Sequence, residues 1–112
     1  DIADAVFAVA HNLAQRPTKA DLRGVFHMAA QGEAVWADVA EAIFAEAVTG
    51  GLLARAPSVE AIPAADYPLP ARRPAYSCLD TTRLRTEFGI ALPDWRMALA
   101  EVVGRLARPD LV

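Results

Sequence analysis

The distribution of proline limits where this chain of 112 residues can form regular structure. Five of the eight prolines fall between Pro57 and Pro74. Because proline lacks a backbone N–H and holds φ fixed, such a stretch can be neither a helix interior nor a central strand. We therefore predict an extended, ordered loop over residues 63–76, with the regular elements on either side of it.

Four segments carry helical signals, and we expect helices at 2–15, 34–48, 81–88 and 94–107. The second has the strongest 3.6-residue stripe, and the pair Gly50-Gly51 ends it. Asp80 stands where the N-cap of the third helix belongs. Apolar residues at helical spacing in the first and last helices should face the core: Ile2, Val6, Val9, Leu13, Trp95, Leu99, Val102 and Leu106.

Two short runs between the helices are typical of strands. Residues 24–29 are apolar and contain β-formers, and residues 59–62 alternate apolar and polar side chains before Pro63. A strand–helix–strand unit with a helical crossover favours parallel pairing. The predicted fold class is therefore α/β, with short parallel strands and about four helices.

Composition and charge exclude several classes of protein. A net charge of −3 without a basic cluster argues against a nucleic-acid partner. No apolar run approaches the ~18 residues of a membrane span, and nothing resembles a signal peptide. The single Cys78 rules out a disulfide framework and a multi-cysteine metal site. It fits a reducing compartment, and we expect a cytoplasmic protein.

Few single residues point to chemistry. His11 and His27 have no partners at metal-ligand spacing, so a structural or merely exposed role is favoured for both. Cys78 is interpreted as a buried, inert thiol rather than a nucleophile. Trp36 and Trp95 are expected to be core anchors. No glycine-rich phosphate loop is present.

The informative pair is Arg72 and Arg73, inside the proline-rich loop. Two guanidinium groups on a stiff loop suit a diphosphate, because each presents its donors in a fixed fork and little ordering entropy is lost on binding. Spacing alone leaves the alternative open, and indeed favours it: these arginines could pair with Asp66 or Asp80, or be solvated.

The order of motifs along the chain resembles the C-terminal part of the dTDP-4-dehydrorhamnose reductases, of the extended short-chain dehydrogenase/reductase family. The resemblance covers nearly the whole chain, with two departures. Ala34 follows Glu33 where these proteins commonly have a Ser or Thr helix cap, and Tyr76 stands where they often have Asn. The most specific matching stretches are Pro70-Ala71-Arg72-Arg73-Pro74-Ala75, Ser77, Leu79-Asp80-Thr81, Leu84, Phe88-Gly89, and Leu92-Pro93-Asp94-Trp95-Arg96 with Leu99. Upstream matches are Asp1-Ile2-Ala3-Asp4-Ala5, Gly24-Val25-Phe26-His27, Trp36 and Tyr67-Pro68.

The resemblance implies that residues 1–112 are a single C-terminal substrate-binding domain fragment, the small lobe of an extended Rossmann-type reductase. The absent N-terminal Rossmann domain would bind NADPH or NADH and carry the catalytic Thr/Ser, Tyr and Lys. Full-length protein would reduce dTDP-4-dehydro-L-rhamnose to dTDP-L-rhamnose. This fragment would form the wall of the nucleotide-sugar cleft, hold no catalytic residue, cofactor or metal, and be inactive alone.

The resemblance assigns substrate binding to Arg72 and Arg73, one of which would approach the diphosphate. It leaves open whether the protein is a homodimer.

Two other functions remain open at this point. One is a non-catalytic, reductase-like regulatory subunit of the methionine adenosyltransferase β-subunit type. An intact Tyr-x-x-x-Lys motif upstream would favour the enzyme over it. The other is a free-standing α/β interaction module, which predicts that residues 1–112 fold well and leave no apolar face exposed.

Overall fold

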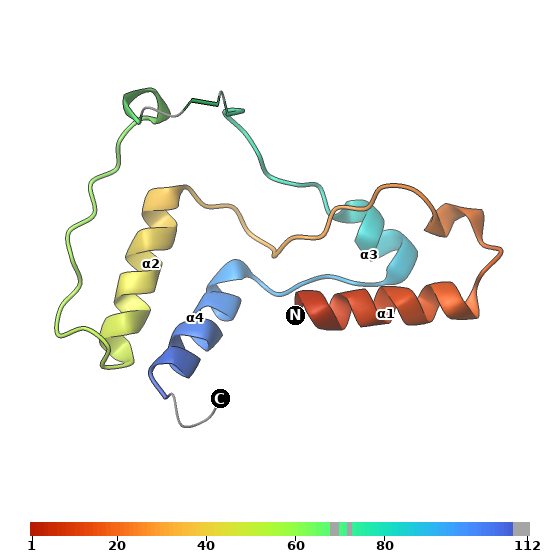
Figure 1. Ribbon diagram of the computed structural model, residues 1–112, viewed down its shortest axis with the longest axis horizontal. Coiled ribbons are helices and arrows are strands. Elements are labelled where there is room, and N and C mark those ends of the chain that lie inside the picture. The colour runs from red at the N-terminus through yellow and green to blue at the C-terminus, as the bar shows by residue number, and fades with distance from the viewer. Residues whose placement is uncertain (68–69, 72, 109–112) are drawn as a thin grey trace. The chain divides into compact units, whose positions relative to one another are not determined.

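The computed structural model describes residues 1–67, 70–71 and 73–108, and the chain divides into two compact units. The first unit comprises Asp1–Gly32 and Cys78–Trp95, and the second comprises Glu33–Ser77 and Arg96–Val112. Figure 1 shows the order of the helices along the chain. Their bounds are α1 Ile2–Gln15, η1 Ala20–Leu22, α2 Trp36–Thr49, η2 Ala64–Asp66, α3 Thr82–Phe88 and α4 Trp95–Leu106.

All four predicted α-helices are confirmed, with ends within two residues of the expected ones. Gly50 ends α2 as predicted, and Gly89 ends α3: their N–H groups donate to the carbonyls of Glu46 and Arg85, at 2.8 and 3.0 Å. Gly89 can do this with a φ of 69°, which favours glycine. The N-cap of α3 is Thr81 rather than Asp80, although Asp80 Oδ1 still accepts from Thr82 N–H at 2.8 Å.

The predicted strand pair is wrong for the residues that the structure describes. Neither 24–29 nor 59–62 forms a strand, and the single parallel bridge joins Gln31 to Asp94. The prediction of short parallel strands is therefore wrong for the described residues, whose regular elements are helices. Residues 59–62 lie just before the proline-rich loop and have no partner strand among the described residues.

A side chain takes the place of a neighbouring strand next to residues 24–29. The Arg83 guanidinium donates from Nη1 to the Val25 carbonyl at 3.0 Å and from Nη2 to the Arg23 carbonyl at 2.9 Å. It also lies over the Phe26 ring, 4.3 Å from the centroid. These backbone acceptors are thus satisfied without a sheet.

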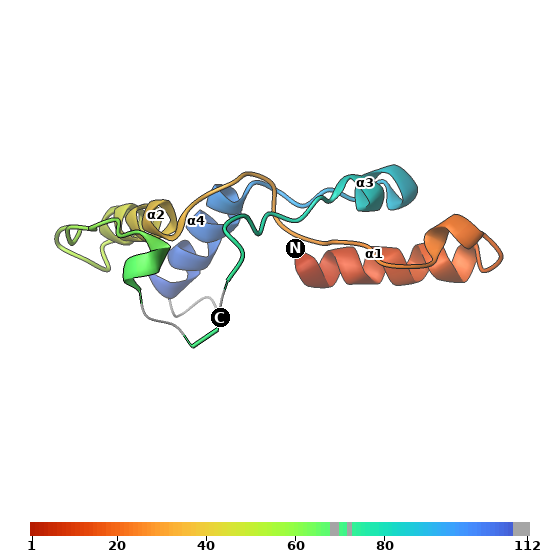
Figure 2. The same cartoon turned by 90° about the horizontal axis from the view of Figure 1, so that it is seen from above.

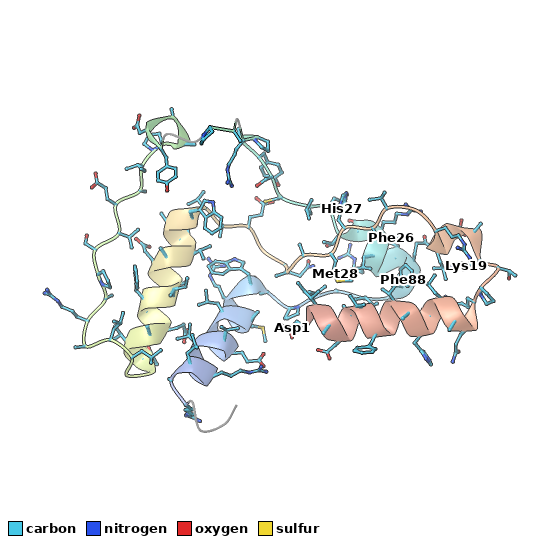
Figure 3. The ribbon with its side chains drawn as sticks, viewed as in Figure 1. Asp1, Lys19, Phe26, His27, Met28 and Phe88 are labelled. Carbon is cyan, nitrogen blue, oxygen red and sulfur yellow. The ribbon has the colours of Figure 1, made fainter. Side chains whose placement is uncertain are left out.

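The core of the first unit is small and lies between α1, η1 and α3. Its buried members are Ala5, Leu22, Leu84, Phe88 and Leu92, with Val9, Phe26, Met28 and Ile90 packed against them. The rings of Phe26 and Phe88 meet edge to face with centroids 5.0 Å apart, and Figure 3 shows both beside Met28. Ala5 is the buried residue of α1 and its contribution to this core.

The predicted inward faces of α1 and α4 are only partly right. Ile2 and Val6 of α1 are exposed, as are Val102 and Leu106 of α4, whereas Ala5 and Val103 are buried. Each helix has apolar residues over a wider arc than the surface it packs against. The 3.6-residue periodicity therefore predicted the helix correctly but did not predict which of its apolar residues are buried. The core-anchor interpretation is wrong for Trp36, which is 83% exposed at the start of α2, whereas Trp95 is half-buried.

The second unit pairs α2 with the body of α4, and the two helices lie side by side in both Figure 1 and Figure 2. Ala47 and Val103 are its buried apolar residues among those described. Gly50 allows a close approach here, because a Cβ at this position would lie 3.2 Å from that of Ala107. Within the described part of residues 63–76, only the turn η2 is regular, as the prolines predicted.

None of the described helices has the length and apolar character needed to cross a membrane.

Candidate functional site

The arginine loop, residues 70–77, follows η2 in the second unit. Arg72 lies outside the described residues. Arg73 is exposed, and within the second unit its guanidinium makes no ion pair with a described carboxylate, Asp66 included. An exposed guanidinium without an ion-pair partner in its own unit, on a loop stiffened by proline, can bind an anion.

Tyr76 ties this loop to the chain just before α2. Its hydroxyl donates to Glu33 Oε1 at 2.6 Å, across 43 residues of sequence. Both residues belong to the second unit. The start of α2 is fixed locally, because Asp38 Oδ2 accepts from the Val35 N–H at 3.3 Å. Sequence reasoning noted Tyr76 only as a departure from the family and gave Glu33 no role.

Asp80 has a local partner, the Thr82 N–H, which donates to its Oδ1 at 2.8 Å. Its pKa is lowered, first by the hydrogen bonds from Thr82 and then by the charges of His27 and Arg85. The carboxylate is exposed and supports the first turn of α3. This gives Asp80 a structural role at the helix start.

The other sequence candidates are also placed. His11 and His27 are exposed, the second of the two roles expected for them. Cys78 is exposed as well, so the prediction of a buried thiol is wrong. In the described ranges, no three His, Cys, Asp or Glu side chains gather closely enough to hold a metal ion.

The residues present do not fit a nicotinamide dinucleotide. Such a cofactor needs a glycine-rich turn between a strand and a helix, so that the backbone can approach the pyrophosphate. Two of the four described glycines with positive φ serve other purposes: Gly89 ends α3, and Gly24 faces the Arg83 guanidinium. What this site can do chemically is bind and position an anionic ligand.

Comparison with known proteins gives a consistent result. Residues 1–108 match the family model described as the RmlD substrate binding domain. The dTDP-4-dehydrorhamnose reductase of Sinorhizobium fredii is 42% identical over 108 residues, which are 95% of this chain and 35% of that protein. The reductase of the same name from Aggregatibacter actinomycetemcomitans is 46% identical over 79 residues, or 70% of this chain and 27% of the relative.

The Escherichia coli K12 dTDP-4-dehydrorhamnose reductase is 34% identical over 97 residues, covering 87% of this chain and 32% of that protein. The chain thus spans about a third of the length of the curated relatives it matches. No solved structure matches it significantly.

Proposed function

Because the chain belongs to the RmlD substrate binding domain family, we propose that it is the C-terminal, nucleotide-sugar-binding domain of a cytoplasmic dTDP-4-dehydrorhamnose reductase. The whole enzyme reduces dTDP-4-dehydro-L-rhamnose to dTDP-L-rhamnose with NADPH or NADH. This domain forms one wall of the nucleotide-sugar cleft. The observation that carries the proposal is the family match over residues 1–108, supported by relatives named as this reductase.

The chain supplies binding rather than chemistry in this proposal. A reductase of this type uses a Tyr whose pKa is lowered by a Lys four residues later. Neither Tyr67 nor Tyr76 has that lysine, since Ala71 and Asp80 occupy the positions. The catalytic residues and the dinucleotide site therefore belong to the N-terminal Rossmann domain of the full-length enzyme.

Exposed apolar surface supports the need for that second domain. On α1, Ile2, Val6 and Phe7 are exposed, the last by 76%. A free-standing module would bury such a face, since each large apolar side chain left in water forgoes roughly 1.5–3 kcal/mol of burial free energy. This observation disfavours the interaction-module alternative, and we assign the α1 face to contact with the Rossmann domain.

The proposed role of the arginine loop is to bind the diphosphate of the dTDP-sugar. Arg73 is exposed and has no acidic partner among the described residues of the second unit, which supports a role for its donors in binding an anion. Adjacent Pro74 restricts the backbone, which lowers the entropy lost on binding. Arg72 is the second candidate for the same contact.

In the full-length reductase, Arg73→Ala or Arg72→Ala is expected to raise KM for dTDP-4-dehydro-L-rhamnose roughly ten- to a hundredfold. A charge-assisted bidentate contact is worth on the order of 1.5–3 kcal/mol. The diphosphate is remote from the reacting carbonyl, so kcat should change much less than KM. Steady-state kinetics of nicotinamide oxidation measures both constants.

Arg55→Ala is the matched control, because Arg55 is an exposed arginine of the same unit outside the loop. Arg55→Ala should leave KM unchanged. Arg73→Lys should raise KM less than Arg73→Ala does, because lysine keeps the positive charge but lacks the paired guanidinium donors. Wild-type KM in both the Arg72 and Arg73 variants would remove the diphosphate role. Absence of any reductase activity in the full-length wild-type protein would favour the regulatory-subunit alternative.

Residues 1–112 alone are expected to oxidise no NADPH or NADH in the presence of the sugar nucleotide. The reason is that the chain contains neither a glycine-rich dinucleotide loop nor a Tyr–Lys pair. Spectrophotometry at the nicotinamide absorbance band measures this, with the heat-denatured chain as the blank. Oxidation above that blank would contradict the assignment of catalysis to the other domain.

A further inference from the structure

We propose that Tyr76 and Glu33 are positioning residues for substrate binding: their hydrogen bond holds the arginine loop in the conformation in which Arg73 meets the diphosphate. The inference rests on the proposed function, since it assumes that Arg73 binds the nucleotide sugar. It adds two residues that act on the ligand through Arg73.

The bond itself is short and charge-assisted. The Tyr76 hydroxyl donates to the Glu33 carboxylate at 2.6 Å, within the range expected of an O–H···O⁻ bond. Tyr76 is 68% exposed, so its hydroxyl lies at the surface, where the Glu33 carboxylate accepts its hydrogen bond.

The bond closes a long segment of chain. Its two ends are 43 residues apart, and the segment between them contains all of α2 and the proline-rich loop. Glu33 stands three residues before Trp36, the first residue of α2, and the Val35–Asp38 hydrogen bond at 3.3 Å orders that start. The loop is therefore tied to a segment that a 14-residue helix anchors.

Fixing the position of Tyr76 also restricts the backbone at Arg73, because the connection between them is short and stiff. Only Pro74 and Ala75 separate the two residues, and Pro74 has its φ angle fixed by its ring. With the Tyr76 hydroxyl released, the loop would have more conformations, and only a fraction of them would present the guanidinium correctly. Apparent affinity falls by that fraction.

The test uses the full-length reductase, with KM for dTDP-4-dehydro-L-rhamnose and the calorimetric Kd for dTDP as readouts. Tyr76→Phe and Glu33→Ala should each raise both constants roughly three- to tenfold, with kcat within about twofold of wild type. The double variant should be no worse than either single one, because both remove the same bond. Glu33→Gln keeps an acceptor oxygen and should retain most of the affinity.

Tyr67→Phe is the matched control, since Tyr67 is an exposed tyrosine of the same unit. Its KM should equal that of wild type. A rise in KM for Tyr76→Phe without one for Glu33→Ala would mean that the hydroxyl touches the ligand directly, and this would overturn the positioning role. A lower melting temperature with unchanged KM would overturn it too, leaving a purely structural bond.

The Arg73→Ala variant separates this inference from the function on which it rests. If Arg73→Ala raises KM while Tyr76→Phe and Glu33→Ala do not, positioning is wrong and the proposed function stands. If Arg73→Ala leaves KM unchanged, Arg73 does not bind the diphosphate, and the proposal that Tyr76 and Glu33 position it is also wrong. In an Arg73→Ala background, Tyr76→Phe should have no further effect on Kd, and an additional loss there would also contradict the inference.

Discussion

Leu84→Ala is expected to lower the free energy of unfolding of the first unit by about 2–5 kcal/mol. Leu84 of α3 is only 1% exposed, the most completely buried large side chain of the described core. It packs in the cluster with Ala5, Leu22 and Phe88, one residue from each of α1, η1 and the end of α3. Truncation would remove the contacts that join these elements and leave a cavity among them.

Chemical denaturation of the full-length protein measures the loss, and hydrogen exchange of the α3 amides assigns it to this unit. Leu79→Ala is the control, because Leu79 lies in the same unit and is 51% exposed. It should cost well under 1 kcal/mol, as surface substitutions usually do. Equal losses for the two variants would show that Leu84 is not the centre of this core.

Gly32→Ala is expected to destabilise the protein by about 2–4 kcal/mol through backbone strain and a steric clash together. Gly32 has a φ of 87°, a conformation that disfavours a side chain. An added Cβ would lie 2.7 Å from Asp94 Oδ2 and 3.0 Å from Cδ1 of Trp95. Relief would require turning the Asp94 and Trp95 side chains beside the Gln31–Asp94 bridge, where Gln31 N–H donates to the Pro93 carbonyl at 3.0 Å.

Gly51→Ala measures the cost of backbone strain without a steric clash, and so separates the two effects expected for Gly32→Ala. Gly51 has a similar φ of 76°, but nothing lies within 4 Å of an added Cβ there. This variant should cost about 1–2 kcal/mol, the penalty of the left-handed conformation alone. Denaturant midpoints of the two full-length variants give the difference. If Gly51→Ala were as damaging as Gly32→Ala, the contact with Asp94 and Trp95 would not matter.

Local signals in the sequence were sufficient for the helices. The stripe that begins at Trp36, the glycines after α2 and α3, and the prolines from Pro57 to Pro74 each act on neighbouring backbone. Because helix hydrogen bonds join residues four apart, short-range patterns predicted helix positions to within two residues. The same patterns identified the arginine loop as an extended, stiff segment.

Contacts between distant residues were decided by the tertiary structure. Whether 24–29 becomes a strand depends on a partner, and the Arg83 guanidinium binds two carbonyls of that region instead. Which apolar residues of α1 and α4 are buried depends on the surface each helix meets, so Ala5 and Val103 are inside while larger neighbours are exposed.

The candidate site divides in the same way. Its arginines were found from the sequence, because charge and proline stiffness are local properties. The bond from Tyr76 to Glu33 spans 43 residues, and no spacing rule connects a loop tyrosine to a glutamate ahead of a helix. Sequence by itself determined the helices, the loop and the charged groups. Only the tertiary structure decided which of these groups meet, because the free energy of such contacts depends on bringing remote segments together.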